Sequence, residues 1–379
     1  MPQPNSSNTI IIGGSAGGLA CAASLKQLNL PYILLEKRNK VGCEWVQRYD
    51  RLHLHTPKKH SHLPYLKMPS YYEQYVSKND LIEYLEAYMH HFSIQPFFNE
   101  EVLKVERKNN LWEVSTNKEK LFGKSVIIAT GYSRKPIQPA WKGIENFQGE
   151  IIHSSEYKNG ANYKNKDVLV VGFGNSACEI ALCLYELNAF PSLSVRSGVN
   201  VIPRDLAGIP ILNIVIAQNW LTKISPRLTD AINKPLLRFI YGNLNRYGLR
   251  QLHVGPTMQV TKYKRIPLLD IGIMRLIKRN TVKVFPGIDH FTADTVVFTD
   301  GREKKIDAVI SATGFQSGLA QLLPEYSKVS DENGIPLVSG KESALPGLYF
   351  CGFHITPTGM LREIGIEAKK IAKSLSRLH

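Results

Sequence analysis

The sequence predicts an α/β fold in which one strand–turn–helix unit occurs twice. The segment TIIIGGSAGGLACAASL (9–25) and the segment DVLVVGFGNSACEIA (167–181) each carry an apolar strand, a glycine-rich turn and the start of a helix. Each is followed by another apolar strand, YILLE (32–36) or SLSV (192–195). Such alternation of strand, helix and strand is typical of a parallel sheet with crossover helices.

The first turn matches the dinucleotide-binding fingerprint of a Rossmann-like domain. Its glycines let the backbone bend tightly and approach a pyrophosphate at the helix N-terminus. The following strand ends at Glu36, at the distance where this motif places an acid on the ribose hydroxyls. Ser15 stands where GxGxxG has its middle glycine, and a small hydroxyl side chain can be accommodated there. The candidate contacts of this nucleotide are Gly13, Gly14, Ser15, Ala16, Gly17, Gly18, Glu36 and Lys37.

The second turn is followed by a different residue type. Arg196 and Ser197 stand where the first unit has its acid. A carboxylate there would repel a 2′-phosphate, whereas a guanidinium binds one in two places, so these residues indicate NADPH rather than NADH. The alternative is that Arg196 only ends a strand in solvent. Two dinucleotide units imply a flavin and its reductant, and Glu36 assigns FAD to the first. The candidate NADPH contacts in the second turn are Gly172, Phe173, Gly174, Asn175, Ser176 and Ala177.

Three later segments are each predicted to form an apolar strand that ends near a glycine. SVIIATGY (125–132) and DAVISATGF (307–315) fit the places where the chain leaves one nucleotide fold and enters the other, and LPGLYFCGF (345–353) would return to the flavin. Ordinary sheet core is the alternative for each segment taken alone. They add Thr130, Gly131 and Gly352 to the FAD candidates and Thr313 and Gly314 to the NADPH candidates.

The order of these segments predicts two Rossmann-like domains, an FAD domain that is split by an NADPH domain. The predicted bounds are 1–163 for the first part of the FAD domain, 164–312 for the NADPH domain and 313–379 for the second part of the FAD domain. Residues of about 205–265, including LTDAINKPLLRFIYGNL, carry apolar side chains at helical spacing and predict a helical insertion. Packing against the NADPH domain and a lid over the substrate both remain open for it.

The net charge, the cysteines and the apolar runs of the chain argue against several classes of function. The net charge of +15 comes from scattered Lys and Arg without a nucleic-acid-binding module, so it favours an anionic cofactor over nucleic acid as partner. The five cysteines include no CxxC pair and no zinc spacing, which predicts a reduced compartment, no dithiol centre and no metal. There is no apolar run long enough for a transmembrane segment, and MPQPNSSN lacks the basic region of a signal peptide, so we expect a cytoplasmic protein.

Between the two units, FQGEIIHSSEY (147–157) matches the pattern FxGxxxHxxx(Y/F) with Phe147, Gly149, His153 and Tyr157. With this pattern, the two turns and the ATG(Y/F) segments in this order, the chain resembles the flavin-containing monooxygenases, and most closely their YUCCA type. The resemblance extends to YDRLHLHTPKKHSHLP (49–64) and VRSGVNVIPRD (195–205), and so covers nearly the whole chain. It departs at Ser15 and at GFHITPTGMLREIGIEAKKIA (352–372), and the second departure bears on the substrate pocket.

The resemblance implies an NADPH- and O₂-dependent monooxygenase that acts on a small molecule through a C4a-(hydro)peroxyflavin. It puts Trp45, His53, His55 and Thr56 near the flavin ring and gives His153 a role in cofactor geometry, with core packing as the alternative for each. No acid–base triad is expected, because the cofactor carries the oxidation.

The YUCCA likeness implies oxidative decarboxylation of indole-3-pyruvate or another 2-oxo acid. The alternatives are N- or S-oxygenation or Baeyer–Villiger oxidation of another small molecule, and a non-catalytic protein that senses FAD and NADP(H). A disulfide reductase is disfavoured by the missing CxxC. A homodimer is left open.

Overall fold

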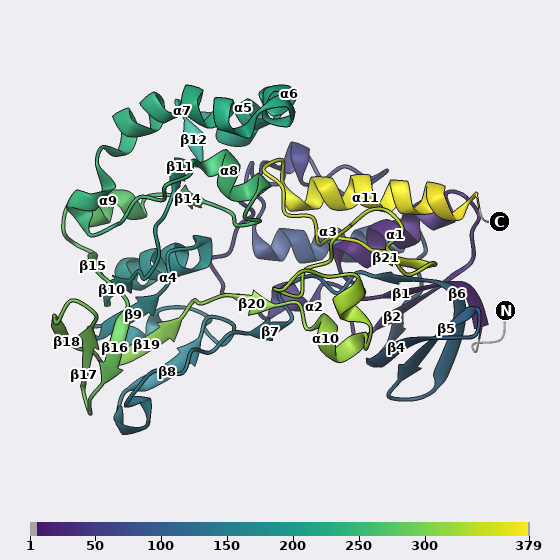
Figure 1. Cartoon of the computed structure of the whole chain (residues 1–379), viewed down its shortest axis with the longest axis horizontal. Helices are drawn as coiled ribbons and strands as arrows, with labels where there is room; N and C mark the ends of the chain where they lie inside the picture. Colours follow the sequence, from purple (N-terminus) through teal and green to yellow (C-terminus); the bar gives the residue numbers. More distant parts are fainter. Residues whose placement is uncertain (1–5, 378–379) are drawn as a thin grey trace.

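A seven-stranded sheet forms one half of the protein in the computed structural model, which describes residues 6–377 (Figure 1). Its order is β3-β2-β1-β6-β5-β4, and β21 pairs with the end of β6. β3, β2, β1, β6 and β21 are parallel, whereas β5 and β4 are antiparallel. The strands are β1 (Ser6–Ile12), β2 (Tyr32–Glu36), β3 (Phe97–Phe98), β4 (Val102–Lys108), β5 (Leu111–Thr116), β6 (Lys120–Ile128) and β21 (Leu348–Phe350).

Three long helices belong to this half. α1 (Ala16–Lys26) is buried from Ala16 to Leu25, and its small side chains let α3 (Lys78–His91) and α11 (Met360–Leu375) pack closely around it. Ser77 caps α3, because its hydroxyl accepts a hydrogen bond from the Asp80 amide at 3.1 Å. The chain returns to this half from α10 (Leu319–Leu322) onward, so α10, β21 and α11 complete cores that the first 130 residues begin.

A second, five-stranded sheet forms the other half and is parallel throughout. Its order is β15-β10-β9-β19-β8. The strands are β8 (Glu150–His153), β9 (Asp167–Val171), β10 (Phe190–Ser194), β15 (Lys283–Phe285) and β19 (Ala308–Ser311). α4 (Asn175–Glu186) joins β9 to β10 and packs on α9 (Ile273–Lys278). An antiparallel sheet of β16 (Ile288–Phe291), β17 (Thr295–Phe298) and β18 (Glu303–Lys305) covers its outer end.

The helical insertion leaves the second half between β11 (Val201–Pro203) and β14 (Leu268–Asp270), which pair with each other. It begins with the hairpin β12 (Asp205–Leu206) and β13 (Ile209–Pro210) and forms a ridge along one edge of the molecule (Figure 1). Its helices are α5 (Ile211–Ala217), α6 (Asn219–Ile224), α7 (Pro226–Tyr241), η4 (Leu244–Tyr247) and α8 (Pro256–Thr261).

The remaining elements are short. They are α2 (Cys43–Val46), η1 (Lys58–His60), β7 (Lys135–Pro136), η2 (Ile144–Asn146), η3 (Ala161–Tyr163), β20 (Phe315–Gln316), α10 (Leu319–Leu322) and η5 (Tyr326–Lys328). β7 and β20 pair antiparallel. They lie side by side where the chain passes from one half to the other and back (Figure 1).

The predicted mixed α/β fold with parallel strands is confirmed, while the domain bounds remain a prediction. β8 falls within the segment predicted as the first part of the FAD domain, yet it pairs with β19 in the second sheet. The sequence gives no sign of this, because strand order depends on contacts distant in the chain. Among residues 6–377, no helix is long and apolar enough to cross a membrane.

Candidate active site

A cavity of about 730 Å³ connects the two halves of the protein. Both glycine turns line it, as do the segment around Trp45–Thr56, the inner side of the insertion and the loop before α11. Volumes of this order are typical of sites that enclose small molecules and cofactors. The cavity therefore defines the candidate active site.

In the first turn, neighbouring backbone lies so close to two of the glycines that a side chain on either one would not fit. Gly13 has φ +108°, and an added Cβ would lie 2.8 Å from the carbonyl oxygen of Ala129. A Cβ on Gly18 would lie 1.8 Å from the carbonyl oxygen of Gly13. Ser15, in contrast, has φ −97° in an extended conformation, which any L-residue adopts. The serine that departs from the fingerprint thus causes no backbone strain.

Glu36 is held beside this turn. The Gly14 amide donates to its Oε2 at 2.6 Å and the Arg38 amide donates to its Oε1 at 2.9 Å. Glu36 and Lys37 line the cavity, with Gly13, Ser15, Ala16 and Gly17. A fixed carboxylate at the end of β2 is what a ribose diol requires as acceptor.

The ATG(Y) segment after β6 leaves space next to the cavity. The Thr130 hydroxyl is buried and has no hydrogen-bond partner among the described residues, although Thr130 lines the cavity. An added Cβ on Gly131 would meet nothing within 4 Å. An orphaned buried hydroxyl and an open backbone position both fit a polar ligand such as the flavin nucleotide. Gly352, after β21, lines the same cavity.

The second turn repeats this construction. Gly172 has φ +128°, and an added Cβ would lie 2.6 Å from the carbonyl oxygen of Ala312. Gly174 has nothing within 4 Å of an added Cβ, as expected where a phosphate approaches the backbone. The Asn175 side chain accepts from the Leu269 amide at 2.9 Å and ties the turn to β14. Gly174, Asn175, Ser176, Ala177 and Gly314 line the cavity, whereas Gly172, Phe173 and Thr313 do not.

Arg196 and Ser197 lie outside the lining of the cavity. Arg196 is exposed two residues after β10, and its Cγ lies 3.5 Å from the Cβ position of Gly287. It makes no hydrogen bond or ion pair with a residue that the structure describes. An unpaired guanidinium at this strand end is free to bind an anion.

The segment after α2 contributes Trp45, His53, His55 and Thr56, and all four line the cavity. His53 Nδ1 lies 2.7 Å from the Arg51 carbonyl oxygen, and Thr56 Oγ1 lies 2.7 Å from Ser61 Oγ. Thr56 also lies against the loop before α11, since a Cβ on Gly359 would be 3.1 Å from its Cγ2. That loop belongs to the segment where the sequence departs from the resembled family, and it lines the cavity through Thr356, Pro357, Gly359 and Met360.

A buried polar cluster crosses between the two halves at the cavity wall. Tyr49 donates a hydrogen bond to Glu179 of α4, and His55 Nε2 lies 3.6 Å from the other carboxylate oxygen. Burial raises the pKa of Glu179 to about 7 and lowers the pKa of His55 to about 4. The distance would suit an ion pair, but both shifts favour two neutral side chains near pH 6.

Glu179 and Tyr49 were not among the predicted site residues. One signal was present, because Glu179 interrupts the apolar helix ACEIALCL (177–184) on a face that is otherwise buried. Its partners could not be read from the sequence, since they come from the other half of the protein.

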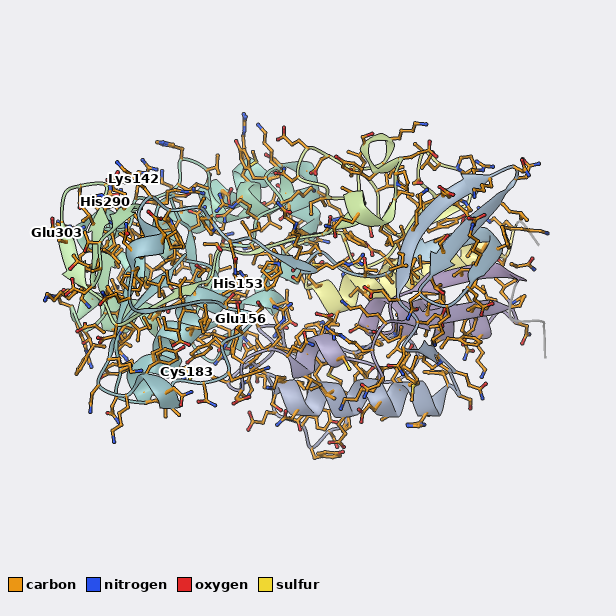
Figure 2. All side chains as sticks on the ribbon, turned by 90° about the horizontal axis from the view of Figure 1, so that it is seen from below. Lys142, His153, Glu156, Cys183, His290 and Glu303 are labelled. Carbon is orange, nitrogen blue, oxygen red and sulfur yellow. The ribbon has the colours of Figure 1, made fainter. Side chains whose placement is uncertain are left out.

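The FxGxxxHxxx(Y/F) segment lies in the second half of the protein, and of its residues only Ser154 lines the cavity. A Cβ on Gly149 would lie 2.5 Å from Phe147 Cε1 and 2.6 Å from the Asp307 carbonyl oxygen. His153 ends β8 beside Ser311 and packs edge-on against Phe315, with ring centroids 5.0 Å apart. Its amide donates to Glu156 at 3.1 Å, and Figure 2 shows the two side by side in the middle of the molecule.

His153 and Tyr157 are both buried, and neither lines the cavity. Burial lowers the pKa of His153 and raises that of Tyr157. A neutral, buried histidine that packs against Phe315, next to Gly314, is suited to positioning the second nucleotide. Among residues 6–377, no group of three or more His, Cys, Asp or Glu side chains could hold a metal ion.

Comparison with known proteins agrees with this construction. A family model described as "Pyridine nucleotide-disulphide oxidoreductase" matches residues 10–200. The "Probable indole-3-pyruvate monooxygenase YUCCA7" of Arabidopsis thaliana is 37% identical over 362 residues, which cover 91% of this chain and 82% of that protein. The "Indole-3-pyruvate monooxygenase YUCCA8" of Oryza sativa subsp. indica is 35% identical over 361 residues, 91% of this chain and 85% of that protein.

Solved structures share the fold at lower identity. A flavin-containing monooxygenase from Stenotrophomonas maltophilia has a TM-score of 0.75 at 20% identity, with 99% of each chain covered. Cyclohexanone monooxygenase from Rhodococcus sp. Phi1, bound to NADP⁺, has a TM-score of 0.71 at 18% identity, with 99% of this chain and 85% of that chain covered. With the identity to its plant relatives over most of its length, the chain belongs to the flavin-containing monooxygenases of the YUCCA-like type, which are NADPH-dependent enzymes that use FAD.

Proposed function

We propose that this enzyme oxidatively decarboxylates an aromatic 2-oxo acid such as indole-3-pyruvate, with NADPH and O₂ as co-substrates. The observation that carries the proposal is the cavity, which reaches both nucleotide turns and ends at the insertion, where α5 and α8 contribute apolar side chains. The printed names of the plant relatives supply the substrate class.

The residues fit both cofactors. The first turn, Glu36, Thr130, Gly131 and Gly352 would hold FAD, and the second turn with Gly314 would hold NADPH, whose 2′-phosphate would lie on Arg196 and Ser197. Bound together, they would supply a hydride and a flavin ring that reacts with O₂. His153 and Thr313 would act as positioning residues behind the second turn.

The insertion would exclude water from the reacting centre. Its cavity-lining residues include Ile211, Leu212, Val215, Val260 and Ile266, and none of its lining residues is charged. Flavin oxygenation requires exclusion of water and protons, since both favour release of peroxide. An apolar wall also provides the surface on which an indole or phenyl ring can pack.

Arg48 is the candidate partner for the substrate's carboxylate. Its guanidinium lies in the cavity wall, 4.6 Å from the centroid of the Phe315 ring. Lys37 and Arg134, which also line the cavity, pair with Glu44 and Glu101. Arg48 has no such partner among the described residues, so it can offer a bidentate contact to an anion.

Product analysis tests the proposal. The FAD-loaded enzyme is given NADPH and a panel of 2-oxo acids, amines and thioethers, and NADPH consumption, CO₂ release and H₂O₂ are measured. We expect CO₂ in equal amount to NADPH with indole-3-pyruvate or phenylpyruvate. Oxygenation of trimethylamine or a thioether, without CO₂ from either 2-oxo acid, would assign the enzyme to N- or S-oxygenation instead.

The Arg48→Met variant tests the carboxylate contact in the same assay. We expect the KM for the 2-oxo acid to rise about 10-fold or more, with the KM for NADPH unchanged. A rise in the KM for NADPH alone would assign Arg48 to the nucleotide. The cytoplasmic location and the absence of nucleic acid as partner stay predictions, and a homodimer stays open.

A further inference from the structure

The insertion exposes a strip of large apolar side chains along α6 and α7. Phe239 is 88% exposed, Ile224 is 72% exposed and Trp220 is 65% exposed. Four members recur every three or four residues along α7 and so follow one face of that helix, and the other two lie four residues apart on α6. This apolar strip consists of Trp220, Ile224, Leu228, Ile232, Leu236 and Phe239.

The side of these helices that faces the cavity is polar, whereas the C-terminal turns of α7 pack Leu237, Ile240 and Tyr241 on the second core. Asn233 donates to Gln218 at 3.1 Å, and the hydroxyls of Thr222 and Thr229 lie 3.4 Å apart. All four residues line the cavity. A surface helix in water turns its apolar face inward and its polar face outward. Around this part of α7 the arrangement is reversed, so the apolar strip requires an apolar environment outside the protein.

Basic side chains accompany the apolar strip. Lys223, Arg227, Lys234 and Arg238 are exposed on α6 and α7. Asp230 is the single acid among residues 209–247, and its carboxylate accepts from the amides of Thr257 and Met258 at 2.8 and 3.0 Å. It therefore caps α8 and does not neutralise the exposed cations.

We propose that α6 and α7 dock on the surface of an anionic lipid bilayer. The apolar strip would enter the boundary between headgroups and acyl chains, and the four cations would bind lipid phosphates and carboxylates. No helix among residues 6–377 is suited to crossing a membrane, so the attachment is peripheral. The ridge lies along an outer edge of the molecule, where a flat surface can reach it (Figure 1).

Charge favours a bilayer over a second copy of the chain. The same face of a second copy offers only cations beside its apolar strip, and hence no carboxylate for Arg227, Lys234 or Arg238. An anionic membrane satisfies the apolar strip and the cations together.

Vesicle co-sedimentation of the FAD-loaded enzyme tests the proposal. The vesicles contain 30% phosphatidylserine in phosphatidylcholine, or phosphatidylcholine alone, in low and high salt. We expect binding to the anionic vesicles that weakens in high salt. Each basic residue near the surface contributes about fivefold, so the variant K234E/R238E should bind at least about 25-fold more weakly. I232S/F239S should also lose most binding.

Two single substitutions outside the strip serve as controls for the type of change. Leu337→Ser replaces another apolar side chain that is 64% exposed, and Lys67→Glu reverses another exposed cation. Both should bind like the unchanged protein, and all variants should keep their flavin absorbance.

Equal binding of the strip variants and the controls would overturn the proposal, as would no binding to anionic vesicles. A dimer in solution that I232S/F239S converts to monomer, without vesicle binding, would show that a second copy covers the strip instead.

Discussion

Replacing Glu179 by Gln should make the protein more stable at pH 8 than the unchanged chain and leave the two equally stable at pH 4. The amide keeps the shape of the side chain, and its oxygen can still accept from Tyr49. Burial raises the pKa of Glu179 from 4.5 to about 7. The unfolded chain therefore gives up this proton at lower pH than the folded chain, and the folded protein loses stability as pH rises from about 4.5 to about 7.

The size of the effect follows from the shift. Each pKa unit corresponds to about 1.4 kcal/mol, so the ionised carboxylate lowers the free energy of unfolding by about 3 kcal/mol above pH 7. The group is almost fully buried, at 3% exposure, so solvent screening removes little of this. Glutamine has no charge to bury, so the variant should keep this stability at pH 8.

Thermal unfolding of both proteins between pH 4 and pH 8, followed by circular dichroism, measures the difference. Glu186→Gln is the matched control, since Glu186 lies on the same helix and its side chain is 54% exposed. We expect the melting temperatures of Glu179→Gln and the unchanged chain to separate as pH rises from about 4.5 to about 7. The melting temperature of Glu186→Gln should change with pH in the same way as that of the unchanged chain. A separation that does not change with pH would show that Glu179 titrates near its ordinary pKa and that the argument from burial is wrong.

Three further substitutions test the nucleotide sites and the FxGxxxHxxx(Y/F) segment. Arg196→Ala should raise the KM for NADPH about 10-fold to 150-fold and leave that for NADH unchanged, because only the 2′-phosphate contact is lost. An equal rise for both would mean that Arg196 does not bind the phosphate. Gly18→Ala should yield protein without flavin absorbance, because its Cβ would lie 1.8 Å from the Gly13 carbonyl oxygen; a fully yellow variant would contradict this. Gly149→Ala should lower the stability by about 1–3 kcal/mol, measured by thermal unfolding, because its Cβ would overlap Phe147 and the Asp307 carbonyl oxygen. Unchanged melting would show that the segment around Gly149 can shift at little cost.

The sequence predicted best what is decided within a short stretch of chain. The two turns, and Glu36 at the end of β2, follow from a local alternation of strand, glycines and helix, and the structure has them in these elements. The cavity lining of Trp45 and His55 was expected only from the family resemblance.

Features decided by contacts between distant segments were not predicted. β8 joins the second sheet through β19, which lies more than 150 residues further along the chain. Glu179 acquires its unusual environment from Tyr49 and His55 of the other half. The outward direction of the apolar strip was also unforeseen, because periodicity reveals that α7 has two faces but not which one is covered.

The near-duplicate ATG(Y/F) segments have a common physical cause. In each half the first glycine of the turn lies against the carbonyl oxygen of the alanine in that segment, Ala129 for Gly13 and Ala312 for Gly172. A side chain on either glycine would collide with the backbone of this alanine. The close packing of each turn against its ATG segment therefore requires a glycine at this position. The two ATG segments are thus alike because each one packs in the same way against the first glycine of a nucleotide turn.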